Sequence, residues 1–374
     1  MRYHFSGAGG AGMNPLARLM AERGHTVQGS DRSFDQGERQ AERALLTADG
    51  VTIVPHDGSG LDAEIDRFVH STAVEADTPE MRRALELELV RLTRPALLQE
   101  VVANGAPGVA VAGTSGKSTV VGMVAWILRC AGIEATILGG AALAEAGASH
   151  MGCFAAGAPG APVIAEACES DGTLIGYRPG IGLIHNISRD HDELAGLQAQ
   201  FTTFANATTS LLINAARAPV HALVADHPQV LSYGIDAGDA PVEVIRPGPH
   251  RAQGELTLPA GEDLFIDLPQ PGVHNLENAA AAALIAHQLG ATPACIASAL
   301  ASFPGVARRY QSLGTTASGV TVIDDYAHNA DKLRAAITTA QEGCTRLLAV
   351  FQPHGFGPAR FLRPELAELL PRIL

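Results

Sequence analysis

Residues 109–120 read VAVAGTSGKSTV and predict a phosphate-binding loop between a buried strand and a helix. The first four residues are small and apolar, as in a strand inside a sheet, and a helical pattern of apolar residues continues to Leu128. Between these two elements the loop consists of Gly113, Thr114, Ser115 and Gly116. Glycines let backbone N–H groups close around phosphate oxygens, and the N-terminus of the helix adds a partial positive charge.

The residues after this loop supply the charge and the hydroxyl group that a nucleoside triphosphate requires. Lys117 is placed to neutralise the β- and γ-phosphates, and Ser118 or Thr119 to bind Mg²⁺ through its hydroxyl group. A plain glycine turn is the alternative, but Lys-Ser-Thr at a strand-to-helix junction favours a nucleotide site. The general P-loop carries a glycine six residues before its lysine, whereas this chain has Val111 there. We therefore predict a shorter variant of the P-loop.

The composition is that of a folded protein with several domains. The chain has 374 residues, 47% hydrophobic and 17% charged, which allows two or three domains with large cores. Its net charge of −13 argues against a nucleic-acid-binding surface and means that local cations and helix N-termini must hold any anionic ligand. The five cysteines form no CxxC pair, which favours reduced thiols in a cytoplasmic protein. No apolar run is long enough to span a bilayer, so we expect no membrane segment.

The first segment, residues 1–105, opens with the layout of a dinucleotide-binding fold. A short strand at residues 3–5 leads into the glycine motif GAGGAG at residues 7–12, then into a helix and a second strand at residues 26–28. Asp31 follows that second strand. This pattern suits the pyrophosphate of a nicotinamide or flavin cofactor, the pyrophosphate of a UDP-sugar, or a purely structural turn. The layout does not separate these three possibilities.

The second segment, residues 106–305, contains the P-loop and two further strands that end in polar groups. The apolar run at residues 163–165 leads to Glu169 and Asp171, and the run at residues 181–184 leads to His191. An open α/β sheet binds its ligands at the carboxyl ends of its strands, so these groups should lie beside the phosphates. Each alone could be an ordinary loop residue. Together with the P-loop hydroxyl they form a plausible divalent-metal site.

An alanine-rich helix opens later in the same segment with the motif GVHNLEN at residues 272–278. Asn275 and Asn278 are three residues apart and therefore lie on one helix face, where their amides could bind a purine edge. A helix cap and a surface asparagine are the alternative. The P-loop in the same segment favours the purine.

The third segment, residues 306–374, begins after a probable linker, Phe303-Pro304-Gly305. Strands are predicted at residues 320–323 and 347–350, with a helix at residues 331–341 between them. This order begins another Rossmann-like unit, but a doubly wound domain normally needs about 100 residues or more. We therefore expect a truncated C-terminal domain.

A series of motifs in one order carries a resemblance to a known family. From the N- to the C-terminus they are HFSGAGGAGM, GSD, HSTA, DTPE, AGTSGKST, EACESDG, HNISRDHDEL, GVHNLENAAAA, ARRYQSLG, DDYAH and FQPH. Single motifs are weak, but this order over nearly the whole chain is specific. The chain resembles the Mur ligases, which add amino acids to UDP-N-acetylmuramate in peptidoglycan synthesis. It is most similar to the branch that adds L-alanine, with the branch that recycles a murein tripeptide as the near alternative.

The resemblance implies an α/β enzyme of three domains that catalyses an ATP-dependent, ADP-forming amide ligation. Residues 1–105 would bind UDP-N-acetylmuramate, residues 106–305 would bind ATP and Mg²⁺, and residues 306–374 would close over ATP and receive the amino acid. The muramoyl carboxylate would attack the γ-phosphate, and the amine of L-alanine would displace phosphate from the acyl phosphate. The phosphorylation is needed because a carboxylate is a poor electrophile at neutral pH.

The resemblance also implies roles for single residues. Lys117, His191 and Arg309 would act in catalysis, with Arg309 reaching ATP across the closing cleft. The rest of the ATP site would comprise Gly113, Thr114, Ser115, Gly116, Ser118, Thr119, Asn275, Asn278 and Asp325. The metal ligands would be Ser118 or Thr119, Glu169 and His191, the last serving a second Mg²⁺ or the transferring phosphoryl group. The UDP moiety would be framed by Gly9, Gly10, Gly12, Asp31 and Ser71.

Two departures from the family pattern lie in the phosphate site. Ser115 stands where the family has a histidine and adds no charge, and Cys168 stands in place of an aspartate. Two hypotheses from other classes stay open at the level of sequence. A nicotinamide-dependent oxidoreductase would use the glycine motif and Asp31 but leaves Lys117 and Glu169 unexplained, and a non-catalytic relative would bind the UDP-sugar without turnover.

Overall fold

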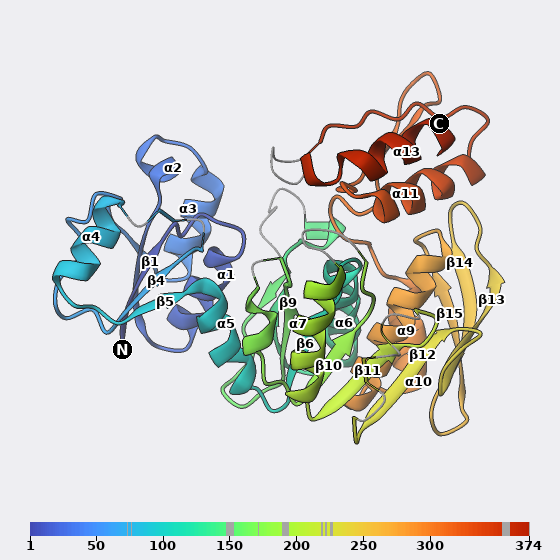
Figure 1. Ribbon diagram of the computed structural model, residues 1–374, viewed down its shortest axis with the longest axis horizontal. Coiled ribbons are helices and arrows are strands. Elements are labelled where there is room, and N and C mark those ends of the chain that lie inside the picture. Colours follow the sequence, from blue (N-terminus) through green and yellow to red (C-terminus); the bar gives the residue numbers. More distant parts are fainter. Residues whose placement is uncertain are drawn as a thin grey trace.

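The chain folds into three bodies that follow one another along the sequence. The computed structural model describes residues 1–72, 74–75, 77–146, 153–170, 172–188, 194–217, 220, 223–224, 227–353 and 360–373. Figure 1 shows the N-terminal body in blue at one end, the large central body in green to orange, and the C-terminal body in red above the central one. The α/β class predicted from the sequence is confirmed.

The N-terminal body is a parallel sheet with strand order β3-β2-β1-β4-β5. Its strands are β1 Arg2–Ser6, β2 Thr26–Ser30, β3 Thr52–Ile53, β4 Arg67–His70 and β5 Arg91–Thr93. Its helices are α1 Met13–Glu22, α2 Arg32–Asp35, α3 Gln40–Ala48, α4 Pro79–Glu86 and α5 Arg94–Ala103. The strands predicted at residues 3–5 and 26–28 are confirmed as β1 and β2. The glycine motif therefore lies at the carboxyl end of the central strand.

The central body is built on a ten-stranded sheet with the order β15-β14-β13-β12-β11-β10-β6-β9-β7-β8. In this order, all neighbouring strands from β13 to β7 pair in parallel. The pairs β13–β14 and β14–β15 at one end of the sheet, and β7–β8 at the other end, are antiparallel. The strands are β6 Gly108–Ala112, β7 Thr136–Leu138, β8 Phe154–Ala155, β9 Val163–Ala167, β10 Ile181–Ile184, β11 Ser210–Asn214, β12 Val230–Ile235, β13 Ala240–Arg246, β14 Ala252–Thr257 and β15 Asp263–Leu268. The predicted strands before Glu169 and His191 are thus confirmed as β9 and β10.

Helices cover both faces of this sheet, and the alternation along β6 shows why. Val109 and Val111 face the core formed with α6 Lys117–Ala131, α9 Val273–Gln288 and α10 Pro293–Ala301. Ala110 and Ala112 face the opposite core, which includes α5 and α7 Leu194–Asn206. Successive side chains of a strand point to opposite faces, so a strand buried on both sides is apolar throughout. Short 3₁₀ turns at Ala144–Ala146 and Thr173–Gly176 complete this body.

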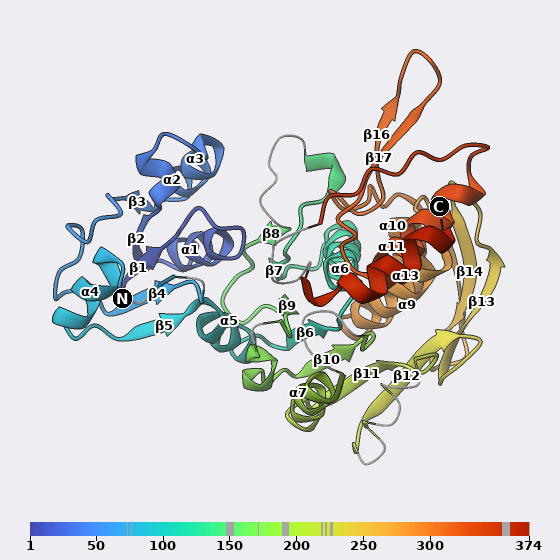
Figure 2. The ribbon, with the colours of Figure 1, turned by 45° about the horizontal axis from the view of Figure 1, so that its top comes forward.

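The alanine run in α9 allows this helix to pack at the centre of the domain. Residues 279–283 are all alanine and have no exposed surface. Small side chains let α9 approach α6 and the sheet closely, and Figure 2 shows α6, α9 and α10 gathered on one side of the strands. The N-termini of α6 and α9 both open on the pocket described below.

The C-terminal body contains an antiparallel pair, β16 Gln311–Thr315 and β17 Thr321–Asp324, and the helices α11 Ala330–Glu342 and α13 Arg363–Ile373. The first predicted strand and the helix are confirmed. The strand predicted at residues 347–350 is wrong: this segment forms no ladder, and Leu348 and Val350 are 82% and 92% exposed. An apolar run becomes a strand only where a neighbour supplies backbone partners, and no described strand lies beside this one. Among the described helices none has both the length and the apolar surface needed to cross a bilayer.

Candidate active site

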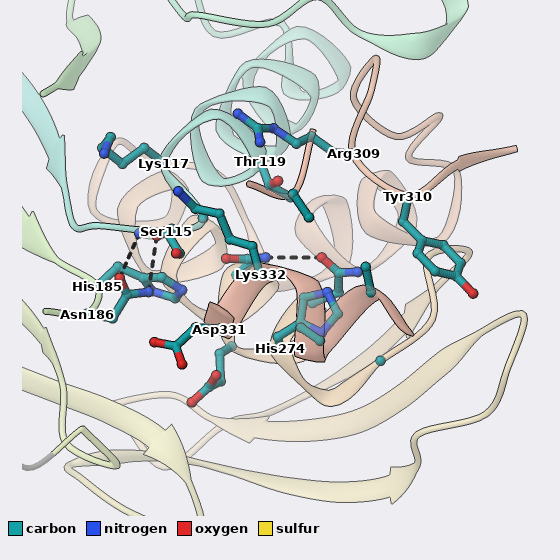
Figure 3. Close-up of a pocket in the computed structure, with 18 of the residues that line it drawn as sticks. Ser115, Lys117, Thr119, His185, Asn186, His274, Arg309, Tyr310, Asp331 and Lys332 are labelled. Carbon is teal, nitrogen blue, oxygen red and sulfur yellow. Dashed lines mark hydrogen bonds between the residues drawn. The ribbon is translucent and has the colours of Figure 1, made fainter. Parts of the chain in front are cut away.

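A cavity of about 860 Å³ lies between the central and C-terminal bodies. The wall from the central body consists of the P-loop, the ends of β9 and β10 and the start of α9. Its other wall comes from Arg309 and Tyr310, the segment after β17 and one face of α11. Figure 3 shows that side chains from both walls point into this space. The cavity thus brings together most residues that the sequence assigned to ATP.

The P-loop has the backbone conformation that its glycines predict. Gly113 and Gly116 have φ angles of +146° and +85°, which residues with a side chain rarely adopt. Asn186 braces the loop from the end of β10: its Oδ1 accepts hydrogen bonds from Thr114 Oγ1 at 3.0 Å and Ser115 N at 2.8 Å. Its Nδ2 donates to Ser115 O at 3.1 Å. Asn186 was not predicted as a site residue, although it lies in the motif HNISRDHDEL.

Lys117 and Glu169 form a buried ion pair at the floor of the cavity. Lys117 Nζ lies 2.7 Å from Glu169 Oε2 and 2.5 Å from the carbonyl oxygen of Gly113. Burial alone would lower the pKa of Lys117, but the charge and hydrogen bond of Glu169, together with the nearby Cys168 and Glu166, outweigh it and raise this pKa above its ordinary value. Lys117 is therefore held as an ammonium ion. The structure brings the predicted phosphate-binding cation and the predicted metal ligand into direct contact.

Substitution of Gly116 by alanine is expected to weaken ATP binding at least about tenfold, because an added Cβ would lie 2.6 Å from Asn278 Oδ1 and the φ angle would be strained. A nucleotide titration of the purified variant measures this loss. The matched control is Gly132→Ala at the other end of α6, where φ is +66° but no atom lies within 4 Å of the new Cβ. The control should bind ATP normally, and equal affinities for both variants would contradict the close packing described here.

His185 lies directly beneath the P-loop and was not predicted. Its Nδ1 is 2.5 Å from Tyr233 Oη, and its ring contacts the position that a Cβ on Gly116 would take. Burial lowers the pKa of His185 to about 4, so the imidazole is neutral at physiological pH. A neutral ring in this place supports the loop without adding charge. No sequence signal distinguishes such a buried support from a catalytic histidine.

Asn275 and Asn278 lie together at the start of α9, as their spacing predicts. Asn278 Nδ2 donates to Asn275 Oδ1 at 3.0 Å, and Asn275 Nδ2 donates to the carbonyl oxygen of Pro271 at 2.8 Å. Within the described part of the chain, Asn278 Oδ1 is buried without a hydrogen-bond partner, and so is the hydroxyl oxygen of Ser115. A buried polar atom without a partner is costly, so both mark positions where a ligand would be favourable.

The C-terminal body contributes Arg309 and Asp325 to the cavity. Arg309 Nη2 lies 3.3 Å from Ser118 Oγ and so bridges the two bodies at the P-loop helix. Both carboxylate oxygens of Asp325 accept backbone N–H groups, from Tyr310 at 2.7 Å and Ala327 at 2.6 Å. Burial raises the pKa of Asp325, although these hydrogen bonds oppose the shift. Asp325 therefore connects the backbone next to Arg309 to the segment after β17. Its contact with ATP stays a prediction.

The second predicted site lies on the N-terminal body. Asp31 joins the glycine loop to α2: its Oδ2 accepts Gly9 N at 2.9 Å and its Oδ1 accepts Ser33 N at 2.9 Å. A Cβ on Gly9 would lie 2.8 Å from Asp31 Oδ2, and one on Gly12 would lie 2.9 Å from the Arg94 side chain. Gly10 lies between them and donates its N–H to Gly7 O. Ser71 follows β4 at the same edge of the sheet.

A buried cluster under this loop centres on Glu80, which has no exposed surface. Its carboxylate accepts Ser6 Oγ and Ser30 Oγ, each at 2.5 Å, from the ends of β1 and β2. It also contacts His4 Nε2 at 3.1 Å and His56 Nδ1 at 2.9 Å. Burial opposes ionisation of Glu80, but hydrogen bonds from the two histidines outweigh it and hold its pKa far below its ordinary value. The hydrogen bond to Glu80 raises the pKa of His56. Glu80 was not predicted as a site residue from the sequence.

Two predicted metal-site residues, Asp171 and His191, lie outside the described residues. Among the residues that are described, no group of three or more histidine, cysteine or acidic side chains forms a metal cluster. Cys168 lines the cavity, with its sulfur 3.0 Å from Ser170 Oγ. The roles of Ser118, Thr119 and Glu169 as metal ligands therefore stay predictions.

Comparison with protein families assigns nearly the whole chain. Residues 2–105 match the model described as Mur ligase family, catalytic domain, residues 111–286 the Mur ligase middle domain, and residues 308–373 the Mur ligase, glutamate ligase domain. The chain belongs to the Mur ligase family. Members of this family are ATP-dependent, ADP-forming amide ligases, which accounts for Lys117 and Glu169 where a nicotinamide-dependent oxidoreductase does not.

Individual relatives agree with this assignment. The chain is 35% identical to the UDP-N-acetylmuramate--L-alanine ligase of Stenotrophomonas maltophilia, with 100% of this chain and 79% of that protein aligned. It is 36% identical to the enzyme of the same name from Xanthomonas campestris, with the same coverage. Among solved structures, the UDP-N-acetylmuramate-alanine ligase of Thermotoga maritima matches with a TM-score of 0.79 and 26% identity over 98% of this chain and 83% of that one.

A murein peptide ligase from Psychrobacter arcticus shares the fold of this Mur ligase. Its TM-score is 0.74 at 24% identity, over 95% of this chain and 79% of that one. The three-domain Mur ligase architecture predicted from the motif order is confirmed by these matches.

Proposed function

We propose that this Mur ligase joins L-alanine to the carboxylate of UDP-N-acetylmuramate, with cleavage of ATP to ADP and phosphate. The observation that carries the proposal is the cavity itself, where the Lys117–Glu169 pair of one body faces Arg309 of another. The full-length similarity to two L-alanine ligases supports L-alanine as the acceptor. The cytoplasm, where the soluble nucleotide-linked precursor and ATP would meet, is the proposed location.

Each of the three domains would bind a different part of the substrates. Residues 1–105 would bind the UDP-sugar, with Gly9, Gly10, Gly12, Asp31 and Ser71 around the UDP moiety. Residues 106–305 would bind ATP through the P-loop, with Asn275 and Asn278 at the adenine. Residues 306–374 would bring Arg309 and Asp325 to the nucleotide. The oxygens of Ser115 and Asn278, which have no hydrogen-bond partner among the described residues, support this placement, because each would gain a hydrogen bond from a ligand.

The proposed reaction has two steps. The muramoyl carboxylate oxygen attacks the γ-phosphorus, the bond to the β-phosphate oxygen breaks, and ADP leaves. The acceptor amine then attacks the acyl carbon, loses a proton and expels phosphate. Lys117 and Arg309 would stabilise the negative charge that shifts between the phosphates, and closure of the cavity would keep water from the acyl phosphate.

A divalent metal fits the donor set at this place. Mg²⁺ prefers hard oxygen ligands and is bound by one or two carboxylates together with substrate phosphates. The Glu169 carboxylate and the hydroxyl groups of Ser118 and Thr119 are such donors, and all three residues line the cavity. When bound there, Mg²⁺ would neutralise charge on the phosphates. His191 is proposed as a further ligand from sequence alone.

A substrate screen tests the proposed function. The protein is incubated with ATP, Mg²⁺, UDP-N-acetylmuramate and one acceptor at a time, and the nucleotide-sugar product is weighed by mass spectrometry. We expect a gain of one alanyl residue with stoichiometric release of phosphate. A gain only with the murein tripeptide would make the chain a recycling ligase. UDP-sugar binding without phosphate release for any acceptor would identify a non-catalytic relative.

Asp31→Ala should weaken binding of the UDP-sugar about tenfold or more, because the carboxylate holds both Gly9 N and the first turn of α2. Calorimetric titration with UDP-N-acetylmuramate measures this effect. ATP binding should be unchanged, since Asp31 lies on the N-terminal body. Glu38→Ala is the control: it removes an exposed carboxylate three residues after α2 without disturbing the contact to Gly9. Equal loss of UDP-sugar affinity in both variants would show that local negative charge, and not the Gly9 contact, determines binding.

A further inference from the structure

Lys332 is a cation of the nucleotide cavity that was not predicted from the sequence. It lies in the first turn of α11 and lines the cavity together with Ser115 and Lys117. In the view of Figure 3 its side chain extends from α11 toward the P-loop. The side chain of Asn329 caps this helix, with Oδ1 accepting Lys332 N at 3.0 Å. The backbone of Lys332 is therefore held in place at the capped N-terminus of α11.

Neighbouring side chains orient the ammonium group of Lys332. His328 Nδ1 lies 2.9 Å from the carbonyl oxygen of Tyr326, which can only accept, so in the neutral ring Nδ1 carries the proton. Nε2 is then an acceptor, and it lies 3.2 Å from Lys332 Nζ. The ring of Tyr326 meets His328 edge to face and lies 5.4 Å below the guanidinium group of Arg309. Tyr326 therefore lies next to Arg309 and is connected to Lys332 through His328.

The charge balance of the cavity favours a ligand role for this cation. Acidic side chains line the cavity from both bodies: Glu166, Glu169, Glu277, Asp325, Asp331 and Glu342. Lys117 is paired with Glu169, and Arg217 with Glu277 at 2.6 Å, so part of the positive charge is already balanced. The other lysine and arginine side chains among the described lining residues are Arg309, Lys332 and Arg334. The chain as a whole carries −13. A triphosphate is drawn into such a site only by cations placed inside it.

We propose that Lys332 binds the triphosphate of ATP from the C-terminal side of the cavity and supplies the positive charge that Ser115 does not. The inference rests on the proposed function, since it concerns the same ATP site. The phosphates would then contact two domains, with Lys117 on the central side and Lys332 on the C-terminal side. ATP should therefore favour closure of the C-terminal domain, whereas AMP, which lacks the β- and γ-phosphates, should not.

The test compares the affinities of ATP and AMP for the full-length protein and its Lys332→Met variant. Methionine retains most of the length of the side chain and removes the charge. We expect ATP affinity to fall about ten- to a hundredfold, as for one charge-assisted contact, and AMP affinity to be unchanged. Lys332→Arg should restore most of the ATP affinity. Arg346→Ala, which removes an exposed cation of the same domain outside the cavity, should leave both affinities unchanged.

The outcomes separate this inference from the proposed function. Normal ATP affinity in Lys332→Met, or equal loss of ATP and AMP affinity, would overturn the inference and leave the ligase assignment intact. Normal ATP affinity with a raised KM for the acceptor would assign Lys332 to the amino-acid carboxylate instead, which also overturns it. If the variant loses ATP affinity but the wild-type protein ligates no acceptor, the inference stands and the proposed function fails.

Discussion

Replacement of Lys117 by alanine should reduce turnover about a thousandfold or more, because the ammonium group acts on charge that develops between the phosphates. Binding of the UDP-sugar should be unchanged, since the predicted site for that ligand lies on the N-terminal body. Steady-state phosphate release at saturating substrates, with calorimetric titration of UDP-N-acetylmuramate, measures both quantities. A variant with a near-normal rate would refute the role of Lys117.

The same substitution has a second effect that must be separated from catalysis. Removal of Lys117 leaves Glu169, whose side chain is 1% exposed, without its cationic partner. Breaking such a buried pair typically costs about 3–5 kcal/mol of stability. The double variant Lys117→Met with Glu169→Gln removes both charges and should recover much of the stability, but not the activity. Arg129→Ala, at the solvent-exposed end of the same helix, controls for general loss of charge and should change neither.

The P-loop could be predicted in detail because its constraints are local. A strand, a turn that needs two glycines with positive φ and a helix N-terminus follow one another within twelve residues, and the structure has that order. The groups that hold the loop could not be predicted. Asn186 and His185 are about seventy residues away in sequence and reach the loop only because β10 pairs with β6. Pairing of distant strands is not encoded in any local pattern.

Two predicted ligands have a structural task that the sequence does not show. Asp31 was assigned to a ligand because it follows the second strand of a dinucleotide-type layout, and Asp325 because the family resemblance implies it. In the structure each carboxylate accepts two hydrogen bonds, all of them from backbone N–H groups. A short acidic side chain after a strand satisfies the turn that follows it, so the same pattern serves structure and binding.

The Glu80 cluster is the opposite case: no site was predicted there from the sequence, yet the structure gathers several ionisable side chains around Glu80. Pro79-Glu80 begins helix α4 and looks like an ordinary acidic first turn. Only the parallel pairing of β1 with β2 and β4 brings Ser6, Ser30 and His4 around that one carboxylate. The cluster therefore ties α4 to the strand ends that carry the glycine loop and Asp31.

The second large effect is expected for Glu80→Gln, which should destabilise the N-terminal domain by about 3–5 kcal/mol near pH 5–6. The amide cannot accept as many hydrogen bonds as the carboxylate and leaves the two serines and two histidines partly unpaired. Because the chain has several domains, one global transition would not report on this site. Hydrogen exchange of the backbone amides of β1 and β2 measures it locally. Glu86→Gln, on the exposed face of the same helix, should have little effect.

The pH dependence of this difference follows from the two shifted pKa values. The pKa of Glu80 is lowered in the folded protein, so its contribution is present above the unfolded value, about 4.3, and is lost as the pH falls below it. The pKa of His56 is raised, so its contribution is complete below about 6.5 and is lost as the pH rises through the folded value. The wild-type protein should therefore be protected most between these limits, with protection falling on both sides. In Glu80→Gln both slopes should flatten, because glutamine does not titrate and His56 loses the carboxylate that raises its pKa. A variant that keeps the alkaline slope would show that His56 is stabilised by another group.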